Sequence, residues 1–141
     1  MAVSETQVRP DPVMGLYDAP LWEYVKQKEL RLQRCADCGE FRYPPGSHCP
    51  NCLSENFEWA RLSGRGRVYA WCVFHRQYFP EIAVPNPIVM VQTEEGPIVA
   101  ANLVGSDPSV LRLDLPMEVT FEPVRWANGK EGMIFQWRLA K

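Results

Sequence analysis

The sequence lacks the features on which several common protein functions depend. Its 141 residues include only two histidines, and 15 basic and 17 acidic side chains leave a net charge of −2. Residues 31–63 carry four charges of each sign and residues 64–141 carry eight of each, so neither part has the basic excess that binding a phosphate backbone demands. No P-loop, dinucleotide fingerprint or G-x-S-x-G elbow occurs. These absences count against a nucleotide-dependent enzyme and against a nucleic-acid-binding module.

Long hydrophobic runs are also missing. No stretch approaches 18 apolar residues, and residues 1–11 are polar, without the apolar core of a secretion signal. We therefore expect a soluble protein of the cytoplasm. In that compartment paired cysteines are read as metal ligands rather than as disulfides.

Four of the five cysteines form two C-x-x-C pairs, Cys35/Cys38 and Cys49/Cys52, with ten residues between the pairs. Two such turns can fold back on one another and present four thiolates at the corners of a tetrahedron, the geometry of a closed structural zinc site. Such a zinc ion has no open position for water or substrate, so it would stabilise a small zinc ribbon. Iron in a rubredoxin-like site, two disulfides and four unrelated thiols are the alternatives.

No catalytic constellation is evident in the rest of the chain. The fifth cysteine, Cys72, lies in the apolar run Tyr69–Phe74, and we expect it to be an inert core thiol. In a continuous strand, Cys72 and His75 would point to opposite faces, so they could not act as a nucleophile–base pair. We expect the isolated chain not to be an enzyme.

The chain divides into three predicted parts: a lead-in with an amphipathic helix (1–29), a zinc ribbon (30–63) and a barrel (64–141). Residues 1–18 are expected to be irregular. A short helix then begins at Asp18 or Pro20, and its apolar face must pack either on its own domain or on a partner.

After residue 64 the pattern predicts five strands with a helical turn between the third and the fourth, which is the order of elements in an OB-fold. A generic five-stranded barrel is the alternative. The fold class predicted for the whole chain is mainly β: a short N-terminal helix, a zinc ribbon and a five-stranded OB-fold barrel. The predicted strands are Val68–Phe79, Ile88–Thr93, Ile98–Val104, Val119–Val124 and Met133–Leu139.

Several motifs in this order resemble a known family. They are Leu30–Gly39, Tyr43–Pro45, Cys49–Cys52, Gly64–Trp71, Ala101–Gly105, Leu115–Phe121 and Phe135. Together they resemble the thiolase-associated family of small proteins with a rubredoxin-like zinc ribbon followed by an acyl-CoA-associated OB-fold. The resemblance covers roughly residues 20–139. Family members often have a proline after the last phenylalanine, whereas this chain continues Phe135-Gln136-Trp137-Arg138, which leaves the surface at the final strand open.

The resemblance implies a non-catalytic accessory subunit that binds a thiolase-like or aldolase-like enzyme and supports acyl-CoA binding or transfer. A CoA groove needs a stacking ring, one or two guanidinium groups and an apolar slot. The candidate ligand-binding residues are Arg34, Arg42, Tyr43, Trp71, His75, Arg76 and Asn102.

Two further functions remain open. Zinc ribbons and OB-folds can both hold single-stranded nucleic acid, and a scaffold without any small-molecule ligand would share every feature but the groove. Because tryptophan is enriched at interfaces, partner contacts are expected at Trp22 and Trp126. Ile82 is a third candidate, because it lies in the apolar loop Pro80–Pro85, which is bracketed by prolines. Trp59, Trp71 and Trp137 are expected to lie in the core.

Overall fold

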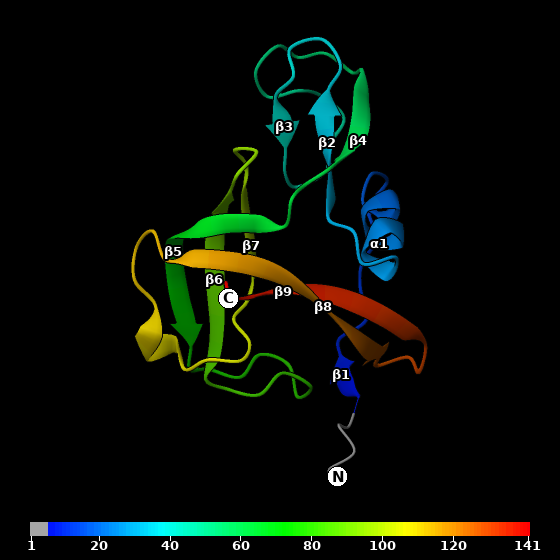
Figure 1. Cartoon of the computed structure of the whole chain (residues 1–141). Helices are drawn as coiled ribbons and strands as arrows, with labels where there is room; N and C mark the ends of the chain where they lie inside the picture. The colour runs from blue at the N-terminus through cyan, green and yellow to red at the C-terminus, as the bar shows by residue number, and fades with distance from the viewer. Residues whose placement is uncertain (1–5) are drawn as a thin grey trace.

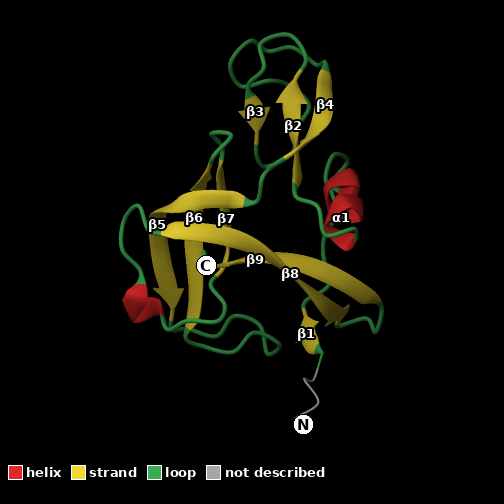
Figure 2. Ribbon diagram, viewed as in Figure 1, coloured by secondary structure: helices red, strands yellow, loops and turns green. Residues whose placement is uncertain are grey.

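The computed structural model describes residues 6–141; residues 1–5 of the predicted lead-in lie outside the described residues. A three-stranded sheet stands at one end of a larger barrel, and a single α-helix lies beside the connection between them (Figure 1). Strands make up most of the regular structure, as the secondary-structure colouring shows (Figure 2). The prediction of a mainly β chain with one short helix is confirmed.

The small sheet is antiparallel, with strand order β3-β2-β4. Strand β2 (Arg31–Cys35) pairs with β3 (Phe41–Arg42) on one side and with β4 (Phe57–Arg61) on the other. Cys35 is the last residue of β2, so the first cysteine pair begins where the strand ends. This sheet therefore fixes the position of the cysteine turns.

The barrel is built from β5 (Arg65–Phe74), β6 (Asn86–Thr93), β7 (Ile98–Asn102), β8 (Pro116–Trp126) and β9 (Glu131–Leu139). A short 3-10 turn, η1 (Pro108–Val110), lies between the third and fourth of these strands. Strand β5 pairs with both β6 and β8, β6 with β7, and β8 with β9. A single parallel bridge, Leu103 to Trp137, joins the two ends of the sheet. This is the partly open Greek-key barrel of an OB-fold, as predicted.

Inward-facing apolar side chains from alternate strand positions fill the barrel. Val89, Val91 and Val99 are fully buried, as expected for strands with one face on a core. Trp137 is also fully buried, and its indole Nε1 donates a hydrogen bond of 3.0 Å to the carbonyl oxygen of Val99. A core position for Trp137 is confirmed, and this bond connects β9 to β7 across the barrel.

Helix α1 (Ala19–Lys26) has a proline in its first turn, where no hydrogen-bond donor is required. Its Leu21 and Val25 are buried, and the ring of Trp22 stacks on Phe135 of β9 with ring centroids 6.0 Å apart. The helix therefore packs on its own barrel, the first of the two predicted arrangements. Across residues 6–141, no helix combines the length and hydrophobicity that crossing a bilayer would need.

Two expectations about the ends of elements are wrong. Within the lead-in predicted to be irregular, Gln7–Arg9 forms strand β1, which pairs in parallel with Val124–Trp126 of β8. Strand β5 ends at Phe74, so residues 75–79, predicted to continue the strand, belong to the loop before β6.

The apolar run in β5 is less buried than predicted. Cys72 is exposed, and Trp71 retains 39 % of its surface, so neither is a core residue. A register irregularity between Val68 and Ala70 interrupts the inside–outside alternation of the strand. After this irregularity, β5 runs along the edge of the core and no longer covers it.

Candidate functional site

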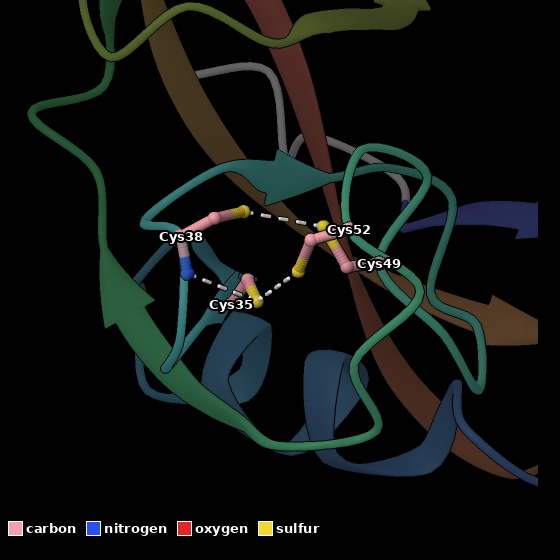
Figure 3. Close-up of side chains that lie close together, drawn as sticks. All are labelled: Cys35, Cys38, Cys49 and Cys52. Carbon is pink, nitrogen blue, oxygen red and sulfur yellow. Dashed lines mark hydrogen bonds between the residues drawn. The ribbon is translucent and has the colours of Figure 1, made fainter.

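The four paired cysteines converge at the tip of the small sheet (Figure 3). Their Sγ atoms all lie within 4.8 Å of one another. The closest pairs join one cysteine of each turn: Cys35 to Cys52 and Cys38 to Cys49, both at 3.5 Å. These separations exceed the roughly 2.05 Å of a disulfide, so the four thiols are free.

The sulfur arrangement fits a tetrahedral metal ion. With metal–sulfur bonds of about 2.3 Å, the edges of a tetrahedron of sulfurs are roughly 3.8 Å long, close to the closest observed separations. Backbone amides also point at the sulfurs: the Cys38 amide donates to Cys35 Sγ and the Asn51 amide to Cys49 Sγ. An all-thiolate donor set of this shape selects zinc or iron.

The thiol pKa values indicate why the cluster needs a cation. The backbone amide of Cys38 lowers the pKa of Cys35 to about 6, and that of Cys52 lowers the pKa of Cys49. The Ser54 amide also lowers the pKa of Cys52, but the Cys35 sulfur and burial outweigh this and raise it to about 12. Neighbouring thiolates repel one another, so four of them can ionise together only around a positive ion.

Polar contacts fasten the two cysteine turns to each other. Asp37 of the first turn accepts hydrogen bonds from Ser54 and Asn56, which follow the second turn. Arg34 donates from Nε to the Gly39 carbonyl oxygen at 3.1 Å and lies over the Phe41 ring. The side chain of Arg34 thus supports the first turn, although it was predicted as a ligand contact.

Arg42, a second predicted ligand contact, lies inside the ribbon. Its side chain is 4 % exposed, stacks over Phe57, and donates from Nη1 to the Gly46 carbonyl oxygen at 3.2 Å. The Gly46 amide in turn donates to Gln33, the cross-strand neighbour of Arg42. These contacts hold the segment between the two cysteine turns.

Four residues that were predicted to bind a ligand or a partner come from distant parts of the chain and meet at one surface groove. Trp22, Tyr43, Asn102 and Trp126 all line it. We call it the tryptophan groove; it has a volume of about 320 Å³, and Arg9, Pro10, Pro12, Ala100, Ala101, Ile134 and Phe135 complete its walls. Gly132 lies directly under Trp126, since a Cβ there would be 2.3 Å from the indole Nε1. Burial raises the pKa of Tyr43.

The remaining candidates lie on or beside the loop between β5 and β6. His75 is exposed, Arg76 stacks over the ring of Tyr78 at 5.2 Å, and Ile82 is half-buried. Arg76 and Ile82 line an apolar pocket of about 240 Å³. The side chain of Gln77 donates to the carbonyl oxygens of Pro80 and Ile82, which gives this loop a defined shape. The residues predicted to bind a ligand or a partner therefore lie at several separate sites in the structure and do not form one site.

Two polar residues that the sequence did not single out lie in a second groove. Arg9 of β1 and Gln136 of β9 line a depression of about 480 Å³, which we call the glutamine groove. Arg9 and Asn102 line both grooves, so the two are adjacent. Arg9 is an isolated arginine in the lead-in and Gln136 is a glutamine in an apolar strand, so no local sequence pattern marks either one as a site residue.

The fold and the cysteine cluster define a class of protein: a rubredoxin-like ribbon followed by an OB-fold barrel. Family models match both parts. Residues 22–58 match the rubredoxin-like zinc ribbon domain of ChsH2, and residues 59–122 match its C-terminal OB-fold domain. The chain belongs to this family, the DUF35 family of zinc-ribbon and OB-fold proteins.

Relatives that are named for different activities share this region. A DUF35 domain-containing scaffold protein of Methanothermobacter thermautotrophicus is 30 % identical over 80 % of this chain and 86 % of that protein. A probable enoyl-CoA hydratase alpha subunit of Thermomonospora curvata is 34 % identical over 78 % of this chain, which spans only 34 % of that protein. Benzoylsuccinyl-CoA thiolase subunit BbsA of Thauera aromatica is 32 % identical over 68 % of this chain and 65 % of that subunit.

Among solved structures, a chain of the Ltp2-ChsH2(DUF35) aldolase superposes with a TM-score of 0.82 at 29 % identity. The superposition covers 93 % of this chain and 100 % of that one. The ribbon, the helix and the barrel therefore have a close counterpart in that structure.

Proposed function

We propose that the chain is a non-catalytic accessory subunit that binds a thiolase-fold or acyl-CoA aldolase enzyme and supports acyl-CoA binding or transfer. One observation carries this proposal: the region is shared by proteins named as subunits of a hydratase, a thiolase and an aldolase. These reactions differ in chemistry, so an element common to all three is poorly suited to perform any one of them. What the hydratase and thiolase names share is a CoA thioester substrate.

We further propose that the cysteine cluster of Cys35, Cys38, Cys49 and Cys52 holds a structural zinc ion. Four thiolates saturate its coordination, so the metal stabilises the fold and supplies no reactive position. The support is the closest sulfur separations of 3.5 Å, together with the amides directed at the sulfurs. Metal analysis of the purified protein distinguishes zinc from iron.

For the enzyme contact, the loop between β5 and β6 is the best supported surface. Tyr78 and Phe79 are 65 % and 50 % exposed, and large exposed aromatic side chains are the usual anchors of an interface. The Tyr78 ring is edge-on to Phe74, and the Gln77 hydrogen bonds order the loop beneath it. A surface ordered in advance loses little conformational entropy on binding. Ile82, predicted as a partner contact, belongs to the same loop.

The test is affinity purification of the full chain from its native host in mild salt. A stoichiometric thiolase-fold or aldolase enzyme is expected, with a lower KM for acyl-CoA when the chain is bound. Tyr78→Ser should weaken the association at least about tenfold, whereas Leu113→Ser, a matched control at another 65 % exposed apolar residue, should not. An enzyme that separates cleanly and keeps full activity alone would refute the proposal.

The same preparation tests the nucleic-acid alternative. The barrel region carries eight basic and eight acidic residues, so a labelled single-stranded oligonucleotide should show no salt-dependent binding. Retention of the oligonucleotide at low salt that disappears at high salt would favour this alternative instead.

A further inference from the structure

The glutamine groove lies where three segments distant in sequence meet. Strand β1, the loop before β6 and the last strand β9 all contribute to its walls. In the ribbon view, β1 lies beside the barrel and the β5–β6 loop extends toward it (Figure 1). Because the tryptophan groove shares Arg9 and Asn102 with it, the two depressions are adjacent and present two chemically different surfaces.

The glutamine groove presents hydrogen-bond donors that lack acceptors. Gln136 is 2 % exposed, and its Nε2 has no hydrogen-bond partner among residues 6–141. The Nε of Arg9 is likewise buried and without a partner in that part of the chain, while its Nη2 donates to Gln7 at 2.9 Å. A buried donor without an acceptor costs about 1–3 kcal/mol, so native structures rarely retain one. Two in one groove point to an acceptor that the chain does not supply.

Arg9 also carries a positive charge that is not paired. No carboxylate of the described residues lies within ion-pair distance of its guanidinium, although Glu122 acts on it from farther away. Partial burial lowers the pKa of Arg9; a bound anion would offset this loss of hydration. The missing acceptor is therefore expected to be negatively charged.

The tryptophan groove is apolar and aromatic. Trp22, Trp126 and Phe135 line it, with small side chains at Ala100 and Ala101. Trp22 is held by its stacking on Phe135, and Trp126 lies over the bare backbone of Gly132. Flat rings placed in this way suit a flat or alicyclic group, because such a group can stack on them.

We propose that the two adjacent grooves together bind a small-molecule carboxylate carried on an aromatic or alicyclic ring. The carboxylate accepts hydrogen bonds from Arg9 Nε and Gln136 Nε2, and the ring lies among the aromatic side chains of the tryptophan groove. This site goes beyond the accessory role proposed above and does not depend on the identity of the enzyme partner.

A singly charged carboxylate suits this site better than a phosphate ester. The buried donors in this groove without a partner among the described residues are one guanidinium nitrogen and one neutral amide, and the acidic residue Glu81 forms part of the wall. A dianion would face Glu81 with only one positive charge to offset it. Substitution of Glu81 should therefore have the opposite effect to substitution of Arg9 or Gln136: removing the negative charge of Glu81 should strengthen the binding of an anion.

The experiment uses the full chain and benzoate as the probe, with benzyl alcohol as a ring of similar size without charge. Calorimetry measures affinity, and tryptophan fluorescence reports occupancy through Trp22 and Trp126. Benzoate should bind saturably with a Kd of about 1 mM or tighter, and benzyl alcohol at least about tenfold more weakly. Arg9→Gln and Gln136→Leu should each weaken benzoate binding roughly tenfold, and Glu81→Gln should strengthen it roughly threefold.

A stability measurement separates binding from folding. Gln136→Leu replaces an unpaired buried amide by an apolar group of similar size, so the melting temperature without benzoate should stay the same or rise. The proposal is overturned if benzoate does not bind, if benzyl alcohol binds equally well, or if Arg9→Gln and Gln136→Leu leave benzoate affinity unchanged. A marked drop in melting temperature for Gln136→Leu would also overturn it, since Gln136 would then be a satisfied structural residue.

Discussion

A methyl group added at Gly66 should separate the strands at the centre of the barrel. Gly66 of β5 pairs with Thr93 of β6 on one side and with Met117 of β8 on the other. A Cβ at this position would lie 2.3 Å from the carbonyl oxygen of Gln92. Real Cβ atoms essentially never approach closer than 3.0 Å, so Gly66→Ala requires a backbone shift of 0.7 Å. With strands on both sides, β5 cannot move from one without pressing on the other.

The cost of Gly66→Ala follows from this geometry. Overpacking typically costs about 1–3 kcal/mol, and weakening one ladder hydrogen bond adds about 1 kcal/mol. The free energy of unfolding should therefore fall by about 2–4 kcal/mol, which lowers the melting temperature by roughly 6–12 °C for a chain of this size. Urea unfolding followed by tryptophan fluorescence, in buffer with excess zinc, measures the change.

Two other glycines provide matched controls. Gly132→Ala has the same 2.3 Å clash, but with the side chain of Trp126, which can swing aside; its cost should be about 0.5–1.5 kcal/mol. Gly46→Ala meets nothing within 4 Å and should be neutral or stabilising by up to about 1 kcal/mol. A cost for Gly66→Ala below that of Gly132→Ala would refute the register of β5 between its neighbours.

Three further predictions concern the ribbon and the helix. Cys38→Ser should abolish stoichiometric metal binding in elemental analysis, whereas Cys72→Ser should retain it, because only Cys38 belongs to the cluster; equal metal content would contradict this. The hydrogen bond from Arg31 lowers the pKa of Glu29 below 4.5, so its ionised form stabilises the fold at neutral pH and the contribution is lost as pH falls through the folded pKa. Glu29→Gln should therefore be less stable than wild type at pH 7, and the difference in melting temperature should vanish on acidification; a constant difference would argue against the ion pair. Trp22→Ala should speed amide exchange in α1 but not in β6, because its ring holds the helix to β9; unchanged exchange in α1 would mean that other contacts suffice.

Local patterns made the ribbon and the order of strands predictable. The cysteine spacing alone indicates the cluster, because a C-x-x-C turn brings two sulfurs together whatever follows it. Strand β1 had no such signal. Its three residues form a strand only because Val124–Trp126 of β8, more than a hundred positions away, offer a free edge. Contacts between residues so far apart in the sequence cannot be predicted from local hydrophobic periodicity.

Exposure was harder to predict than secondary structure. The run containing Trp71 and Cys72 has the composition of a core strand, but the irregularity after Val68 and the end of β5 at Phe74 leave much of it uncovered. The grouping of Trp22, Tyr43, Asn102 and Trp126 in one groove could not be read from the sequence either, since four different segments supply them.

At Gln136, a long-range contact that could not be predicted makes the exposure differ from what the local pattern indicates. Between Phe135 and Trp137 it looks like the solvent-facing member of an alternating strand. It is buried instead, because β1 and the loop before β6 border the same groove on that face. The segment predicted to be irregular thus produces the burial, and burial turns an ordinary polar residue into an unpaired donor. A polar side chain in an apolar strand is therefore informative only when the structure shows what covers it.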